Sequence, residues 1–242
     1  MNAPPAPAPV LYLLDVDGTL MLSNGAGREA LNQAFLALHG HAGAMDGVAL
    51  AGMTDPIIVE EMFLGKLGRA PSDGERTALV DAYLPILATL LQEPGRAYLM
   101  PAVLASLDFL QGCPEVRLAV ATGNVRAGAR SKLESVRLWH RFLTGGFGDD
   151  AADRAVLVAR AIARAEALCG FGFARSRVVV VGDTPRDVSA ARACGIRALA
   201  VATGTYSHAE LLETDADAVL HTLAELPAWH RAQFHAHEPF AR

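Results

Sequence analysis

The chain has 242 residues, enough for one α/β core with an inserted or appended module. Hydrophobic residues make up 52% of it and aromatic residues only 6%, a composition typical of Ala-, Leu- and Val-rich helices packed on a parallel sheet. The formal net charge of −5, without a block of lysine or arginine, excludes the basic footprint of a nucleic-acid-binding protein, and no run of about 18 apolar residues predicts a membrane span.

The N-terminal stretch 1–9 contains four prolines and has neither a basic start nor an apolar centre. It therefore predicts a disordered tail rather than a helix or a signal peptide. The three cysteines, Cys113, Cys169 and Cys194, are far apart and offer neither a disulfide framework nor a zinc-binding spacing. We expect free thiols in a reducing compartment, and the expected location is the cytoplasm.

The first predicted strand is the apolar run Val10–Leu14. After it, the region 23–99 carries helical patterns without a convincing pair of strands. Turn-forming residues flank this region, with Ser23-Asn24-Gly25 on entry and Pro94-Gly95 on exit. We therefore expect a helical module inserted after the first strand, with helices at Ala26–Leu38, Pro56–Leu67 and Glu75–Leu91.

Beyond the module, strands and helices alternate. The predicted strands are Val116–Ala121, Arg177–Val181 and Ala198–Ala202, with weaker candidates at Leu143–Phe147 and Ala218–His221, and the helices are Val125–Val136, Arg154–Leu168 and Pro185–Cys194. This order predicts parallel strands joined by right-handed crossovers, and hence a doubly wound, Rossmann-like α/β core made of 10–22 and 100–242. For the segment after Pro227, packing on the core and a loose end both remain open.

Acidic residues follow two of the predicted strands. Asp15 and Asp17 come directly after the first strand, and Asp183 and Asp187 follow the strand at 177–181. Because ligands of open α/β sheets bind at the carboxyl ends of the strands, these four side chains are expected to meet in one crevice. Clustered carboxylates repel one another, and Mg²⁺, which prefers carboxylate oxygens, is the usual remedy.

The strand between those two acidic positions ends in Thr122-Gly123-Asn124. A hydroxyl followed by a glycine N–H offers two donors to a phosphoryl oxygen. The same residues also fit an ordinary strand-to-helix turn in which Thr122 or Asn124 caps the helix, and this alternative stays open.

Taken in order, these motifs resemble those of phosphatases of the haloacid dehalogenase (HAD) superfamily. The resemblance implies that Asp15 is the nucleophile, that Asp17 is the general acid and base, and that Thr122 binds the phosphate. It also implies a Mg²⁺ ion held by Asp15, by the backbone carbonyl of Asp17, by Asp183, and by Asp187 either directly or through water.

The family's third motif requires a lysine or arginine, but its usual Lys-Pro dipeptide is absent. Two residues qualify: Lys132, inside the helix that follows Thr122, and Arg154, at the start of the next helix. Spacing in the family favours Arg154, which is then expected to bind phosphate together with Thr122, Gly123 and Asn124. Lys132 is expected to face solvent.

The inserted module resembles the cap of phosphoglycolate phosphatase-like members, which closes over the site and reads the organic part of the substrate. Within it, Arg28 and Thr54 are the candidate substrate contacts. Thr54 and Asp55 also fit a helix N-cap, which is a sufficient structural role. The histidines that invite a metal-binding interpretation are expected to face solvent instead: His39, His41, His230, His235 and His237.

The function expected from these residues is Mg²⁺-dependent hydrolysis of a small phosphorylated metabolite, such as phosphoglycolate, a sugar phosphate or a nucleotide monophosphate, through an aspartyl-phosphate. Asp17 argues against dehalogenation, which needs no protonated leaving group. A phosphomutase of the β-phosphoglucomutase type remains open, as does a non-catalytic phosphoacceptor that resembles response-regulator receivers. The chain is expected to be a monomer or a homodimer.

Overall fold

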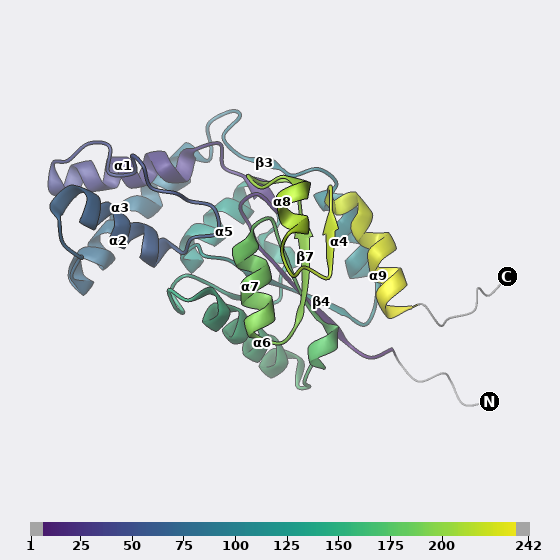
Figure 1. Ribbon diagram of the computed structural model, residues 1–242. Coiled ribbons are helices and arrows are strands. Elements are labelled where there is room, and N and C mark those ends of the chain that lie inside the picture. The colour runs from purple at the N-terminus through teal and green to yellow at the C-terminus, as the bar shows by residue number, and fades with distance from the viewer. Residues whose placement is uncertain (1–6, 236–242) are drawn as a thin grey trace, which may run out of the picture.

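The computed structural model describes residues 7–235 and shows a six-stranded sheet between helices, with a helical module beside it (Figure 1). The strand order is β5-β4-β1-β6-β7-β8, and all five pairings are parallel. The strands are β1 (Val10–Leu14), β4 (Val116–Ala121), β5 (Gly145–Gly146), β6 (Val178–Gly182), β7 (Arg197–Val201) and β8 (Ala218–Leu220). The predicted α/β class is confirmed; residues 1–6 of the predicted tail lie outside the described part of the chain.

Helices cover both faces of the sheet. On one face α4 (Val103–Gly112), α5 (Arg126–Ser135) and α9 (Leu226–Phe234) bury their apolar side chains, and on the other face α6 (Arg154–Cys169) and α7 (Pro185–Ala193) do so. The short helix α8 (His208–Leu212) connects β7 to β8, and single 3-10 turns lie at Trp139–Arg141, Arg175–Arg177 and Leu223–Glu225. Because both faces are covered, the central strands are continuous apolar runs rather than alternating ones.

The inserted module, called the cap below, contains α1 (Ala26–His39), α2 (Asp55–Leu67) and α3 (Asp73–Leu90). The chain leaves and re-enters the core through a short antiparallel pair, β2 (Met21–Leu22) and β3 (Tyr98–Leu99). The three helices bury a separate apolar cluster of their own, and they lie at the left of Figure 1. This arrangement confirms a helical insert between the first two long strands.

Two helix starts place polar residues at the carboxyl edge of the sheet. Asp153 caps α6 by accepting from the backbone N–H of Ala155, which makes Arg154 the first residue of that helix. At α7, Thr184 and Asp187 form a capping box with Pro185 at the first position. The strong start signals fix the direction in which Arg154 and Asp187 enter the site.

The observed helices and strands differ from the predicted ones in a few places. The weak strand expected at Leu143–Phe147 is reduced to two glycines, and α4 and α9 were not predicted. The segment after Pro227 does not hang loose over its described part, because α9 packs on α4. Within residues 7–235, every helix is too short or too polar to cross a membrane.

Candidate active site

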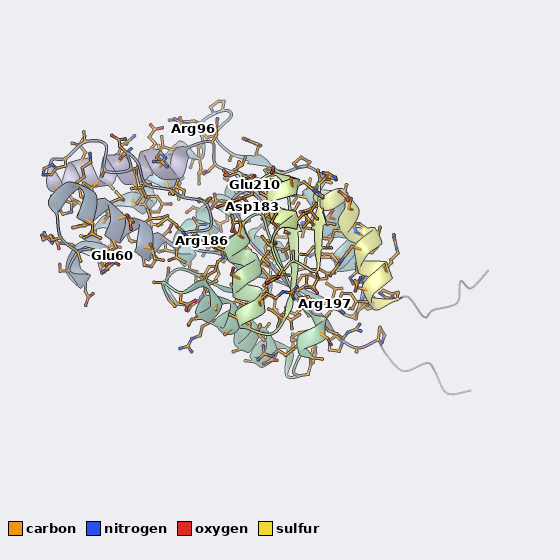
Figure 2. The ribbon with its side chains drawn as sticks, viewed as in Figure 1. Glu60, Arg96, Asp183, Arg186, Arg197 and Glu210 are labelled. Atoms are coloured by element: carbon orange, nitrogen blue, oxygen red, sulfur yellow. The ribbon has the colours of Figure 1, made fainter. Side chains whose placement is uncertain are left out.

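A cavity of about 440 Å³ lies between the carboxyl edge of the sheet and the cap. Asp15, Asp17, Asp183 and the Thr122-Gly123-Asn124 turn reach it from the ends of β1, β4 and β6. Lys132 of α5 and Arg154 of α6 line it as well, whereas Asp187 does not. Figure 2 shows Asp183 in the core close to the side that the cap covers. The neighbouring strands β4, β1 and β6 therefore bring together residues that are far apart in the sequence.

Asp15 lies in a buried cluster of charges. Its carboxylate is 2.8 Å from the guanidinium of Arg154, which is also 2.6 Å from Asp187. Carboxylate oxygens of Asp15, Asp183 and Asp187 lie within 4.8 Å of one another. Burial raises the pKa of Asp15 to about 6, although Arg154 acts to lower it. The acid expected to be the nucleophile is therefore held next to the cation expected for the third motif.

Asp183 lies under unusually tight backbone packing. A Cβ on Gly18 would be 2.4 Å from its carboxylate, and one on Gly204 would be 1.7 Å away. Gly18 also has a φ of +78°, so this position in the Asp-x-Asp-Gly-Thr turn requires glycine twice over. Burial, with the charges of Asp187 and Asp15, raises the pKa of Asp183 to about 8.

The same cluster fits a magnesium ion. Three buried carboxyl groups share one guanidinium, so their charge is not balanced by Arg154 alone. Oδ2 of Asp187 accepts from the backbone N–H and the hydroxyl of Thr184, and Oδ1 is the oxygen that lies 2.6 Å from Arg154. Hard oxygen donors around uncompensated negative charge are the set that Mg²⁺ prefers.

Asp17 lies apart from that cluster and is partly exposed. Nζ of Lys132 is 2.8 and 2.7 Å from its two carboxylate oxygens, and Nδ2 of Asn124 donates to Oδ2 over 2.7 Å. Lys132 also donates to Oδ1 of Asn124 over 2.7 Å. The two acids of the first motif, two positions apart in the sequence, thus have different basic partners.

The expectation that Lys132 faces solvent is wrong, because the residue is only 6% exposed. On α5 it shares the buried side with Gly128, Ala129 and Leu133. Ala129 and Leu133 pack on the sheet, whereas Gly128 lies beside Tyr83 of α3 in the cap. The spacing of these four residues is that of one helix face, so the sequence carried a signal for a buried lysine. A buried lysine requires a charged partner, which Asp17 supplies.

The turn after β4 makes its own contacts with the cap. Thr122 is buried, and its hydroxyl accepts from Asn124 through both the backbone N–H and Nδ2. A Cβ on Gly123 would be 2.3 Å from the carbonyl oxygen of Met53, so the cap loop lies directly against this glycine. The backbone N–H of Asp55 donates to the carbonyl of Gly123 over 2.8 Å. Gly123 therefore serves the docking of the cap as well as lining the cavity.

The two candidate cap contacts have different positions. Arg28 lines the cavity, but its guanidinium donates to the backbone carbonyls of Met45 and Val48. The hydroxyl of Thr54 donates to the carbonyl of Ala152 over 3.0 Å, which joins the cap to the core; Thr54 is not among the residues that line the cavity.

Asp55, for which the sequence favoured a helix-capping role over a position in the cleft, lines the cavity. Its Oδ2 accepts from the backbone N–H of Val125 over 2.7 Å, so the cap places a carboxyl group at the start of α5. Burial raises the pKa of Asp55 to about 6, against the charge of Lys132, which lowers it.

The expectation that the C-terminal histidines face solvent is wrong for His230, which is fully buried; His237 lies outside the described residues.

Comparisons with known proteins agree with this geometry. Residues 154–226 match the HAD-hydrolase-like family model. The chain is 29% identical over 226 residues to phosphoglycolate phosphatase of Rhodospirillum rubrum, covering 91% of this chain and 90% of that protein. It is 28% identical over 224 residues to the probable phosphatase IndB of Dickeya dadantii, covering 89% and 91%.

Solved structures share the fold. One is described as a predicted phosphoglycolate phosphatase from Haemophilus somnus; it aligns with a TM-score of 0.68 at 18% identity, over 92% of this chain and 97% of that one. At this identity the likeness concerns the fold alone.

Proposed function

We propose that this chain, which is similar to HAD-like hydrolases, is a Mg²⁺-dependent phosphatase that hydrolyses a small phosphomonoester through an aspartyl-phosphate. One observation carries the proposal: two carboxyl groups two positions apart have different surroundings. Asp15 is buried against Arg154, and Asp17 is partly exposed against Lys132. Pairs of acids with different environments are typical of sites that divide nucleophilic and acid–base roles.

In the proposed reaction the carboxylate of Asp15 attacks phosphorus in line. An oxygen–phosphorus bond forms on Asp15 while the bond to the substrate's alkoxide breaks, and water later hydrolyses the aspartyl-phosphate to release inorganic phosphate. A pKa of about 6 leaves this carboxyl group mainly ionised at neutral pH, as a nucleophile must be. Arg154 lies within contact distance of Asp15, where it would stabilise charge on the transferring oxygens.

Asp17 is proposed as the general acid that protonates the leaving alkoxide and as the base that then activates water. Its position at the edge of the cavity supports this, because the alkoxide leaves toward the cap. Thr122, Gly123 and Asn124 are proposed to hold the phosphoryl group from the side of β4. Asn124 also donates to Asp17, which ties the phosphate-binding turn to the proposed acid.

The residues proposed to hold Mg²⁺ are Asp15, Asp183 and Asp187, with the backbone carbonyl of Asp17. When bound, the ion would supply positive charge to the phosphoryl oxygens and relieve repulsion among the carboxylates. Arg154 is proposed as the third-motif cation rather than Lys132, because it contacts both Asp15 and Asp187.

A phosphomutase acting on a bisphosphate needs a second phosphate site, which the cap would have to supply. Among the described cap residues that line the cavity, the one cation is Arg28, and its guanidinium is already bonded to backbone carbonyls. Asp55 adds negative charge to the same wall. Hydrolysis of a monophosphate is therefore the better-supported function. Phosphoglycolate, sugar phosphates and nucleotide monophosphates remain the candidate substrates.

The test is phosphate release from a panel of these esters, with and without Mg²⁺. Wild type is compared with Asp15→Asn and Asp17→Asn, and Asp81→Asn, on the exposed side of α3, is the matched control. We expect Mg²⁺-dependent release that both active-site variants lose and the control keeps. If the folded wild type releases phosphate from no ester, the proposal is wrong, and a stable phosphoprotein would then indicate a phosphoacceptor.

A further inference from the structure

A second cluster of possible metal ligands lies at the opposite end of the sheet from the cavity. Cys113 follows α4, Glu115 directly precedes β4, and His230 and His235 belong to α9 and the residue after it. Helices α4 and α9 pack together, on the side of the core away from the cap in Figure 1. The proposed hydrolysis uses none of these residues.

These side chains converge with their donor atoms. Sγ of Cys113, a carboxylate oxygen of Glu115 and a ring nitrogen of His230 all lie within 4.8 Å of one another. Nε2 of His235 is 2.8 Å from Oε1 of Glu115 and 3.3 Å from Nε2 of His230. Cys113 and Glu115 thus bring a sulfur and an oxygen close to a ring nitrogen of His230, and His235 approaches from the side of Glu115 and His230.

The separation of the imidazoles matches a shared metal ion. Two nitrogens bound about 2 Å from a tetrahedral Zn²⁺ lie roughly 3.3 Å apart. The other ring nitrogen of His230, Nδ1, is 2.8 Å from the hydroxyl of Tyr12, which is itself fully buried on β1. Such a partner fixes the ring of a metal-binding histidine and directs its second nitrogen toward the metal.

Burial and charge favour a cation at this point. His230 is 0% exposed and Glu115 only 5%. Among residues 7–235, the ion-pair partners of Glu115 are the two imidazoles, not a lysine or an arginine. A buried carboxylate beside two imidazoles and a thiol is a donor set that suits a divalent cation.

We propose that Cys113, Glu115, His230 and His235 form a Zn²⁺-type site that fastens α9 to the amino-terminal edge of the sheet. Mixed sulfur and imidazole ligands favour zinc over magnesium, so this site and the Asp15 cluster take different ions. Occupation requires the Cys113 thiol, which now lies 3.4 Å from the carbonyl of Phe109, to lose its proton and turn toward the metal.

The test uses the full chain, stripped of metal and then titrated with Zn²⁺ or Co²⁺ alone. Asp183→Asn removes the competing carboxylate site. We expect this variant to bind one equivalent, and the Co²⁺ form to show a thiolate-to-metal charge-transfer band. Cys113→Ser should abolish the band, whereas Cys169→Ser, which changes a cysteine outside the cluster, should retain it.

Two further variants protect the test against loss of folding. His235→Ala alters the end of α9 and should weaken Zn²⁺ binding at least tenfold, whereas the exposed His140→Ala should not. Tyr12→Phe keeps all four ligands and should weaken binding by about 10- to 100-fold. The proposal is refuted if the Asp183→Asn protein takes up no Zn²⁺, or if Cys113→Ser binds Co²⁺ with an unchanged spectrum.

Discussion

Removing the negative charge of Asp183 should stabilise the metal-free protein at alkaline pH. Its pKa is raised from an ordinary 3.8 to about 8, first by burial and then by the charges of Asp187 and Asp15. Between these two values the folded protein holds a proton that the unfolded chain releases, so folding becomes less favourable as pH rises through that window. Asp183→Asn abolishes this titration.

The size of the effect follows from the pKa. A single proton changes the free energy of unfolding by at most about 1.4 kcal/mol per pH unit, so the loss between pH 6 and pH 8 is roughly 2–3 kcal/mol. For a chain of this size that corresponds to about 4–12 °C in the melting temperature. Asp15, with a pKa raised to about 6, adds its own loss of folding free energy mainly below pH 6.

The assay is thermal unfolding of both proteins in chelator from pH 6 to pH 8, followed by the same series with Mg²⁺. We expect the melting temperature of wild type to fall with pH more steeply than that of Asp183→Asn, and Mg²⁺ to stabilise only wild type strongly. Other titrating groups cancel, because both proteins contain them. Equal pH dependence of the two melting temperatures without metal would refute a raised pKa for the carboxyl group of Asp183.

Three other predictions concern turnover. Arg154→Met should lower kcat by roughly 10²–10³-fold, as does the loss of other groups that stabilise charge on a transferring group. It should also move the acid limb of the pH–rate profile to higher pH, because Arg154 lowers the pKa of Asp15. Our assignment fails if Lys132→Met is the inactive variant and Arg154→Met turns over normally. Asp17→Asn should still form the aspartyl-phosphate with an activated ester but hydrolyse it slowly. Mass spectrometry of quenched protein should therefore detect the phosphorylated form, and rapid loss of this adduct would contradict the prediction. Gly123→Ala should raise KM, because its Cβ would meet the cap loop at 2.3 Å, whereas Gly65→Ala, with open space around it, should not; equal KM values would contradict the docking role.

That the motifs meet in one site was predictable from a simple topological rule. Strands that run parallel end at one edge, so acids after β1 and β6 and a threonine after β4 had to meet once those strands were neighbours. The sequence also marked the start of α6 and α7 through capping residues, and hence the positions of Arg154 and Asp187. Local signals of this kind do not depend on distant packing.

What the sequence did not predict depends on contacts between distant segments. Lys132 was expected at the surface, but the cap packs against its helix and buries it beside Asp17. Asp55 fitted a helix cap, and only the docked cap shows that its carboxyl group accepts from Val125. His230 meets Glu115 because α9 folds back on the sheet, and no pattern within either segment indicates that contact.

Two of the basic residues that line the cavity, Arg154 and Lys132, are bound to different acids, and this separation bears on how the cap could act. Both acids that Arg154 contacts belong to the core, and its guanidinium also donates to the carbonyl of Gly52 in the cap over 3.4 Å. Lys132, in contrast, lies on α5, which contacts α3 of the cap, close to Gly27 and to the cap side of Asp17. A movement of the cap would therefore change the surroundings of the Asp17–Lys132 pair and leave Asp15 with its partner. The proposed nucleophile is built into the rigid core, while the proposed acid lies at the seam where substrate and cap meet.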